Sequence, residues 1–105
     1  MQPAEAAQRS QDLFLLDVRE PEEWDAGHIA GSHHIPMGEL PRRLDEVPTD
    51  ATVLAICRSG NRSGRVTAWL AEQGYEVRNL DGGLKAWHAE NLALDSGEGD
   101  PGVVA

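Results

Sequence analysis

Hydrophobic residues along this chain gather in short runs, and most of these runs are continuous. Residues 13–16 and 53–56 are apolar throughout, whereas residues 76–80 alternate between apolar and polar. A continuous apolar run is typical of a strand that is covered on both faces, as in a parallel sheet. The predicted strands span residues 13–18, 52–56, 76–80 and a short part of 29–36.

The segments between these runs carry helical patterns. In the clearest one, Val66, Trp69, Leu70 and Gln73 form one apolar stripe, and Gly74 follows as a stop signal. The predicted helices span residues 3–9, 21–26, 39–47 and 61–73, and a last helix begins after residue 81. Strands that alternate with helices predict an α/β fold, a three-layer domain with a central, mostly parallel sheet flanked by helices. Ligands of such sheets bind at the carboxyl ends of the strands.

The length and composition fit one globular domain. The chain has 105 residues, and the strand and helix patterns place this domain at about residues 3–92. Residues 95–105 are rich in Ser, Gly, Pro and acidic residues, so we expect a disordered acidic tail. The 18 acidic residues outnumber the 9 basic ones, and the net charge of −9 argues against nucleic acids and anionic membranes as partners.

Cysteine content and targeting signals bear on the compartment. Cys57 is the single cysteine, so the chain forms no internal disulfide and no multi-thiolate metal site. The sequence shows no signal peptide, and its apolar runs are far shorter than the ~20 residues of a membrane span. We therefore expect a reducing, cytoplasmic setting. His28, His33 and His34 raise the question of a metal, but neighbouring strand residues point to opposite faces, so we expect packing or surface roles and no metal site.

The candidate chemistry centres on Cys57, which ends a predicted strand and precedes a predicted helix at Asn61. Backbone N–H groups at a helix start point at such a thiol, and adjacent arginines favour its ionised form, so we expect a lowered thiol pKa. Arg58, Arg62 and Arg65 form a basic island in an acidic chain, and this island would attract a small anion. The alternative is a cysteine that serves only as a small buried hydrophobic residue.

Three positions near this loop have roles that the pattern leaves open. Gly60 is expected to adopt a backbone conformation that other residues avoid, or to let the chain approach a ligand closely. Ser63 could cap the helix or donate a hydrogen bond to the sulfur. Asp17, at another predicted strand end, is expected to pair with an arginine, and a catalytic role is the alternative.

Four segments of the chain resemble signature blocks of the rhodanese family. The loop matches the family pattern Cys-x-x-Gly-x-Arg-Ser through Cys57, Gly60, Arg62 and Ser63. The other blocks are residues 16–24, residues 27–32 together with 35–36, and residues 81–87. Because the blocks occur in order over most of residues 3–92, the resemblance extends through the whole predicted domain.

This resemblance implies a single-domain sulfurtransferase of the thiosulfate type. The family cysteine accepts a sulfane sulfur from a small anionic donor, thiosulfate or a persulfide, and passes it to cyanide or a thiol, including a protein thiol. Cys57 would then be the catalytic nucleophile, Arg58 would face the incoming anion, and Arg62 would shape the loop and add charge. The implied substrate-binding residues are Arg58, Ser59, Gly60, Asn61, Arg62 and Ser63. No metal or organic cofactor is needed.

The chain departs from the family pattern at a few positions. Ile56 replaces a frequent aromatic residue, and His34 replaces a usual asparagine, so the pocket shape and the choice of donor are expected to differ. A leading edge strand that is common in the family is expected to be very short or missing.

Three other functions stay open at this point. A rhodanese-like binding module without turnover would keep the fold, although degenerate members usually lack the cysteine. Phosphatases related by fold have five residues between the cysteine and the arginine, whereas this loop has only residues 58–61, so phosphatase or arsenate reductase activity is less favoured. A redox sensor would oxidise Cys57 reversibly, but the chain has no second cysteine to resolve the product.

Overall fold

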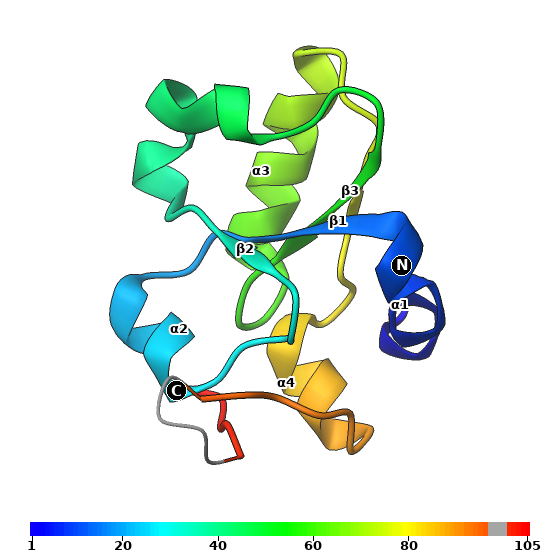
Figure 1. Ribbon diagram of the computed structural model, residues 1–105, viewed down its shortest axis with the longest axis vertical. Coiled ribbons are helices and arrows are strands. Elements are labelled where there is room, and N and C mark those ends of the chain that lie inside the picture. Colours follow the sequence, from blue (N-terminus) through cyan, green and yellow to red (C-terminus); the bar gives the residue numbers. More distant parts are fainter. Residues whose placement is uncertain (97–100) are drawn as a thin grey trace.

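The computed structural model describes residues 1–96 and 101–105, and at its centre lies a sheet of four parallel strands (Figure 1). The strands are β1 (Leu13–Asp17), β2 (His33–His34), β3 (Thr52–Ile56) and β4 (Val77–Asn79), in the spatial order β2-β1-β3-β4. Helices pack on both faces of this sheet. The predicted α/β fold, a three-layer domain with a mostly parallel sheet, is therefore confirmed.

The helices agree with the sequence pattern in position. They are α1 (Pro3–Arg9), α2 (Pro21–Ala26), α3 (Asn61–Glu72), α4 (Gly83–Ala89) and two 3₁₀ helices, η1 (Ser10–Asp12) and η2 (Met37–Glu46). None of the helices in the described ranges is long and apolar enough to cross a lipid bilayer. In Figure 1, η2 lies above β1 and α4 lies below it.

The two central strands, β1 and β3, divide their side chains between two hydrophobic cores. Leu15 and Leu54 point into one core, which α1 and α4 cover, whereas Leu16 and Ala55 point into the other, which η2 and α3 cover. This alternation follows from the two-residue period of a strand. Both cores are closed by helices, which explains the uninterrupted apolar runs 13–16 in β1 and 53–56 in β3. Cys57 belongs to the core beneath α3.

The segment before β3 differs from the regular helix predicted over residues 39–47. It forms the 3₁₀ helix η2, with Pro41 inside it and a break at Arg43, whose φ and ψ are −114° and 18°. Proline has no N–H to donate and clashes with the preceding turn, so a continuous α-helix is disfavoured there. Leu40 still reaches the core, which is why the apolar spacing resembled that of a helix.

The chain reaches α1 without forming an edge strand first. In the described residues no strand precedes β1, and the backbone N–H of Asp81 donates to the carbonyl of Met1 at 2.9 Å. The amino group of Met1 also donates to the carbonyl of Asn79 at 2.7 Å, so two hydrogen bonds of Met1 beside the end of β4 stand where we expected a very short or missing strand.

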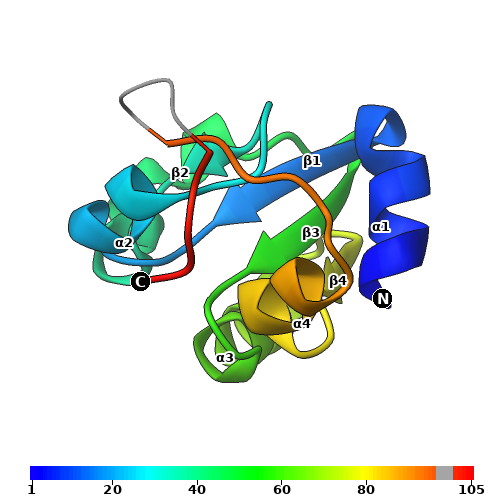
Figure 2. The same ribbon diagram turned by 90° about the horizontal axis from the view of Figure 1, so that it is seen from below.

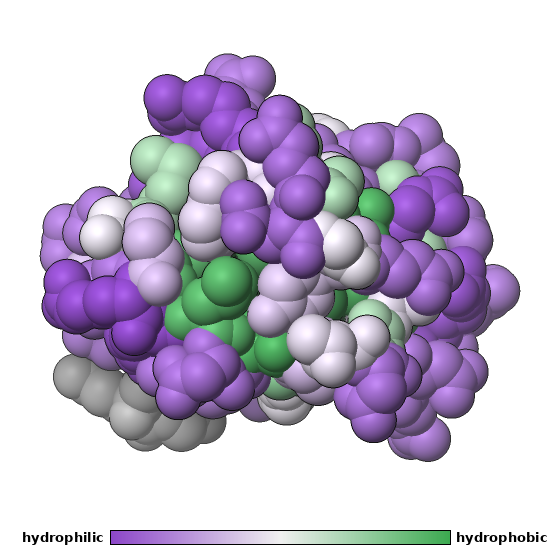
Figure 3. Space-filling view, turned by 90° about the horizontal axis from the view of Figure 1, so that it is seen from above, coloured by the Kyte–Doolittle hydropathy of each residue, from purple (hydrophilic) through white to green (hydrophobic). Residues whose placement is uncertain are grey.

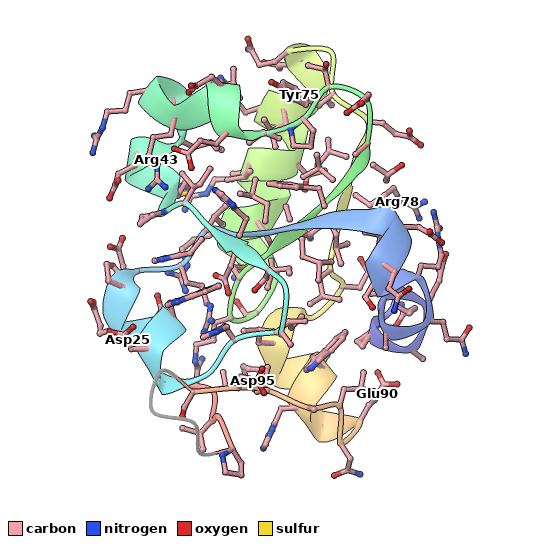
Figure 4. The ribbon with its side chains drawn as sticks, viewed as in Figure 1. Asp25, Arg43, Tyr75, Arg78, Glu90 and Asp95 are labelled. Atoms are coloured by element: carbon pink, nitrogen blue, oxygen red, sulfur yellow. The ribbon has the colours of Figure 1, made fainter. Side chains whose placement is uncertain are left out.

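The C-terminal segment contacts the domain at several points. His28 and Asp95 exchange two backbone hydrogen bonds of 2.8 Å, and Asp95 lies in the lower part of the view in Figure 4. The N–H of Val103 donates to the carbonyl of Ala26 at 2.9 Å, so residues 101–105 lie against α2 (Figure 2). Residues 97–100 lie outside the described residues, and the disorder expected for residues 95–105 stays a prediction.

Candidate active site

Cys57 lies directly after β3, at the carboxyl end of the sheet, and the loop that follows it surrounds its sulfur with donors. The N–H of Gly60 donates to Sγ at 3.0 Å, and the hydroxyl of Ser63 lies 3.2 Å from Sγ. Only 1% of the residue is exposed. A thiol that serves only as a buried hydrophobic group needs no such donors, so this geometry supports a chemical role.

These contacts determine the acidity of the thiol. Burial raises the pKa of Cys57, but hydrogen bonds from the Ser63 hydroxyl and from the backbone N–H groups of Ser63, Gly60 and Ser59 lower it, and the net shift is downward from 9.0. Donors stabilise the thiolate because it carries a full negative charge. The lowered pKa expected from the sequence is therefore present, and the backbone amides and one hydroxyl contribute more to it than the arginines.

The local conformation of the loop depends on Gly60. This residue has a φ of +98°, which side-chain-bearing residues rarely adopt, and it is the N-cap of α3. The left-handed turn aims the Gly60 N–H back at the sulfur, as the sequence suggested. Ser63 does not cap α3; its buried hydroxyl contacts Sγ instead, so the second of its two expected roles is correct. Asn61 is exposed at the first turn of α3.

Asn79 is a site residue that the sequence analysis missed. It ends β4 and pairs in register with Ala55, two residues before Cys57. Its Oδ1 accepts a hydrogen bond from the Ser63 hydroxyl at 2.5 Å, and its Nδ2 donates to the carbonyl of Gly60 at 3.2 Å. The signal was available, since a polar residue at the end of a strand beside β3 faces the same edge of the sheet.

The start of α4 supports the same loop from another side. The N–H of Leu84 donates to the carbonyl of Cys57 at 2.9 Å, and that of Lys85 donates to the carbonyl of Arg58 at 3.0 Å. Gly83 has a φ of +62°, and a Cβ built there would lie 2.5 Å from the Arg58 carbonyl oxygen. Gly83 therefore lets α4 approach the loop closely, which gives the 81–87 block a structural reason.

The three arginines of the basic island lie in different environments. Arg62 forms an ion pair with Glu23 at 2.7 Å, and the Nε of Arg58 donates to the carbonyl of Ala105 at 2.9 Å. Arg65 lines an apolar groove of about 260 Å³ between η2 and α3, on a side where the space-filling view from above shows apolar surface within a polar surround (Figure 3). The structure therefore does not direct all three charges at Cys57.

Asp17 has a structural partner, as expected. Arg19 donates to its two carboxylate oxygens at 2.9 and 2.8 Å, and both side chains are almost fully buried. Arg19 also donates to the carbonyl of Gly27 at 2.7 Å, so the pair fixes the path of the chain around α2.

The three histidines near the site make packing and surface contacts. His28 and His34 each stack on Trp24, with ring centroids 3.7 and 4.8 Å apart, and His33 contacts Glu46 at 2.8 Å. Within residues 1–96 and 101–105, no group of three His, Cys, Asp or Glu side chains is arranged to hold a metal ion.

Comparison with known proteins agrees with this architecture. Residues 2–90 match the rhodanese-like domain. The chain is 41% identical over 91 residues to a sulfurtransferase of Allochromatium vinosum, with 86% of this chain and 85% of that protein covered. It is 38% identical over 82 residues to the thiosulfate sulfurtransferase GlpE of Ectopseudomonas mendocina, with 77% and 75% covered.

A solved structure shows the same fold. The crystal structure of a rhodanese-related protein from Thermoplasma volcanium superposes with a TM-score of 0.87 at 31% identity, covering 90% of this chain and 94% of that one. Because the family match extends over most of the chain and the two relatives above carry the name sulfurtransferase, this protein belongs to the rhodanese family.

Proposed function

We propose that this protein is a thiosulfate sulfurtransferase that carries sulfane sulfur as a persulfide on Cys57. The single observation that carries the proposal is the pair of hydrogen-bond donors at Sγ, namely the Gly60 N–H at 3.0 Å and the Ser63 hydroxyl at 3.2 Å. These donors lower the pKa of the Cys57 thiol and so favour the nucleophilic thiolate, and the relatives named above make sulfur transfer the reaction that fits it.

The proposed first half-reaction is a displacement at sulfur. The Cys57 thiolate attacks the outer sulfur of thiosulfate, a new S–S bond forms, the original S–S bond breaks, and sulfite leaves with its electron pair. The product is an anionic persulfide on Cys57. The backbone N–H groups of the loop, which already point toward Sγ, are well placed to stabilise negative charge on the outer sulfur.

The second half-reaction regenerates the enzyme. A thiophilic acceptor such as cyanide, or a thiolate, attacks the outer sulfur, and the Cys57 thiolate leaves. With cyanide the product is thiocyanate. No electron is gained or lost by an external partner in the cycle, so these steps require no redox cofactor.

Arg58 and Arg62 have different roles in this proposal. Arg58 and Ser59 are exposed beside the buried sulfur. Arg58 donates to Ala105 through its Nε, so the rest of its guanidinium can meet an incoming anion at the surface. Arg62 is paired with Glu23, and we assign it mainly to holding the loop and α3 in position. Asn61 and Ser59 contribute their backbone to the wall of the site.

Intact mass spectrometry tests the proposal. The protein is incubated with thiosulfate and then with cyanide, beside a Cys57→Ser variant and a parallel assay with an aryl phosphate. We expect the native chain to gain the mass of one sulfur atom, to lose it on cyanide addition, and to release thiocyanate, whereas Cys57→Ser does neither. Phosphate release without sulfur uptake, or sulfur uptake that persists in Cys57→Ser, would overturn the assignment.

A further inference from the structure

The hydroxyl of Ser63 faces two acceptors but carries one proton. Its Oγ lies 3.2 Å from the Cys57 sulfur and 2.5 Å from Oδ1 of Asn79. A hydroxyl makes one full donor bond at a time, so the two acceptors compete for the same proton. The distance to Asn79 lies at the short end of the range for O–H···O bonds, and 3.2 Å is an ordinary distance for an O–H···S bond because sulfur is the larger atom, so either acceptor can take the proton in this geometry.

The side-chain amide of Asn79 cannot turn to avoid this competition. Its Nδ2 donates to the carbonyl of Gly60 at 3.2 Å, and a flip would place two carbonyl oxygens against each other. The amide orientation is therefore fixed by the loop itself, and Oδ1 must face Ser63. Asn79 thus contacts the two residues whose N–H and O–H groups point at the sulfur.

The two protonation states of the cysteine need different arrangements of Ser63. A thiol can donate its own proton to the Ser63 oxygen, and the hydroxyl can then donate to Asn79. A thiolate has no proton and only accepts, so the hydroxyl must turn toward the sulfur and give up Asn79. The thiol proton leaves to water when this happens.

We propose that Asn79 is a positioning residue that competes with the Cys57 sulfur for the Ser63 proton, so that the hydroxyl bonds to Asn79 in the thiol form and to sulfur in the thiolate form. Asn79 acts through Ser63 and does not touch the reacting atoms. This inference rests on the proposed function only in taking the Cys57 thiolate as the nucleophile. Its consequence is that Asn79 sets the balance between thiol and thiolate.

The loop has a second anchor that makes the inference testable. The Gly60 carbonyl also accepts the N–H of Gly64 at 2.9 Å, as the first backbone bond of α3. Loss of the Asn79 amide therefore leaves Gly60 held by the helix, and the Gly60 N–H stays aimed at the sulfur. Asn79→Leu removes both polar atoms and keeps the branching at Cγ. Asn79→Ala serves as the second variant if the larger side chain prevents folding.

The experiment measures the rate of Cys57 alkylation by iodoacetamide against pH in four full-length proteins: native, Asn79→Leu, Ser63→Ala and the double variant. We expect the midpoint of this rate-against-pH curve, which reports the ionisation of Cys57, to move to lower pH in Asn79→Leu and to higher pH in Ser63→Ala. Below both midpoints, Asn79→Leu should react about threefold to tenfold faster than native, because the thiol form loses one neutral hydrogen bond, from Ser63 to Asn79, that opposes ionisation. The double variant should match Ser63→Ala.

Two results would overturn the inference. One is a midpoint in Asn79→Leu and Asn79→Ala that is unchanged or higher than native. The other is a double variant whose midpoint lies as far below that of Ser63→Ala as the midpoint of Asn79→Leu lies below that of the native chain. Asn79 would then act without Ser63. Sulfur uptake from thiosulfate is measured on the same samples. Shifted midpoints with no uptake by the native chain would contradict the proposed function and leave the role of Asn79 intact.

Discussion

Glu23 on α2 and Arg62 on α3 are joined by two parallel hydrogen bonds of 2.7 and 2.8 Å, although 39 positions separate them in the chain. The Arg62 guanidinium lowers the pKa of Glu23 to about 2. In return, Glu23 first and the charge of Cys57 second raise the pKa of Arg62. The pair therefore links the 16–24 block to the active-site loop.

This ion pair gives the stability of the protein a specific acid dependence. The folded pKa of Glu23, about 2, lies below its ordinary value of 4.5, so the stabilisation is fully present above pH 4.5 and is lost as pH falls toward 2. We expect Glu23→Gln to lower the free energy of unfolding at pH 7 by about 1 to 2 kcal/mol. Urea unfolding at a series of pH values should also show a weaker loss of stability between pH 4.5 and 2 than in the native chain.

Glu22→Gln is the matched control for this prediction. Glu22 is the preceding residue on the same helix and is exposed. Its substitution should leave both the stability at pH 7 and the acid profile close to native. If both variants lost stability equally, the effect would come from the charge of α2 as a whole and not from the bond to Arg62.

Arg58 is expected to govern donor capture. Arg58→Ala should raise the KM for thiosulfate several-fold with a smaller change in kcat, because the guanidinium attracts the anion without touching the breaking bond. The KM of the native enzyme should rise with ionic strength, and that of the variant should rise less. Steady-state kinetics at low and high salt provide the measurement.

Arg65→Ala is the control for Arg58, because both arginines belong to the same sequence cluster. Arg65 lines the groove between η2 and α3, beside apolar side chains such as Trp69. Its removal should leave the KM and its salt dependence near native. Equal effects of the two substitutions would mean that the general charge of the region, and not the position of Arg58, attracts the donor.

The positions of the central strands were predictable because a strand that is buried on both faces has an uninterrupted apolar sequence. The continuous apolar runs at 13–16 and 53–56 became β1 and β3 within one or two residues. The loop conformation was also predictable, since a short loop that joins a strand to a helix and contains Gly60 can adopt few backbone conformations. The Asp17–Arg19 pair was also within reach, because a charged residue at a buried strand end needs a partner.

The contacts between distant polar groups were not predictable in the same way. Periodicity shows which face of an element is buried, but it does not show which polar group lies opposite. The Asn79 contact with Ser63 and the Glu23 contact with Arg62 depend on how β4 and α2 are placed beside the loop. The broken helix η2 was missed because its apolar spacing is compatible with two kinds of helix.

Gly83 is expected to be needed for the close contact between α4 and the loop. Gly83→Ala combines a strained φ of +62° with a Cβ that would lie 2.6 Å from the carbonyl oxygen of Cys57. We expect a loss of about 2 to 4 kcal/mol in the free energy of unfolding. The loop carbonyl must move away, so the alkylation midpoint of Cys57 should rise and sulfur uptake should slow.

Gly74→Ala separates strain from contact in this prediction. Gly74 has a similar φ of +94°, but no atom lies within 4 Å of a Cβ built there. This variant should lose only the smaller stability expected from backbone strain and should keep the native alkylation profile. A native profile in Gly83→Ala as well would show that the active-site loop does not depend on α4.

The C-terminal segment is expected to compete for Arg58. The Nε of Arg58 donates to the carbonyl of Ala105, and the segment is held in place by the close approach of Gly102 to Gly27. A Cβ at Gly102 would lie 2.7 Å from the Cα of Gly27, so Gly102→Ala should move the segment. The freed Nε should then give the Arg58 guanidinium one more donor for thiosulfate, so the KM should be about twofold to threefold lower, the value of one exposed hydrogen bond.

A double variant and a neighbouring control make this last prediction specific. Gly102→Ala should not change the KM when Arg58 is already replaced by alanine, because no guanidinium remains to be released. Val103→Ala, which trims an exposed side chain but keeps the backbone bond to Ala26, should behave as native. If Gly102→Ala lowered the KM equally with and without Arg58, the segment would act by blocking access to the sulfur and not by occupying the arginine.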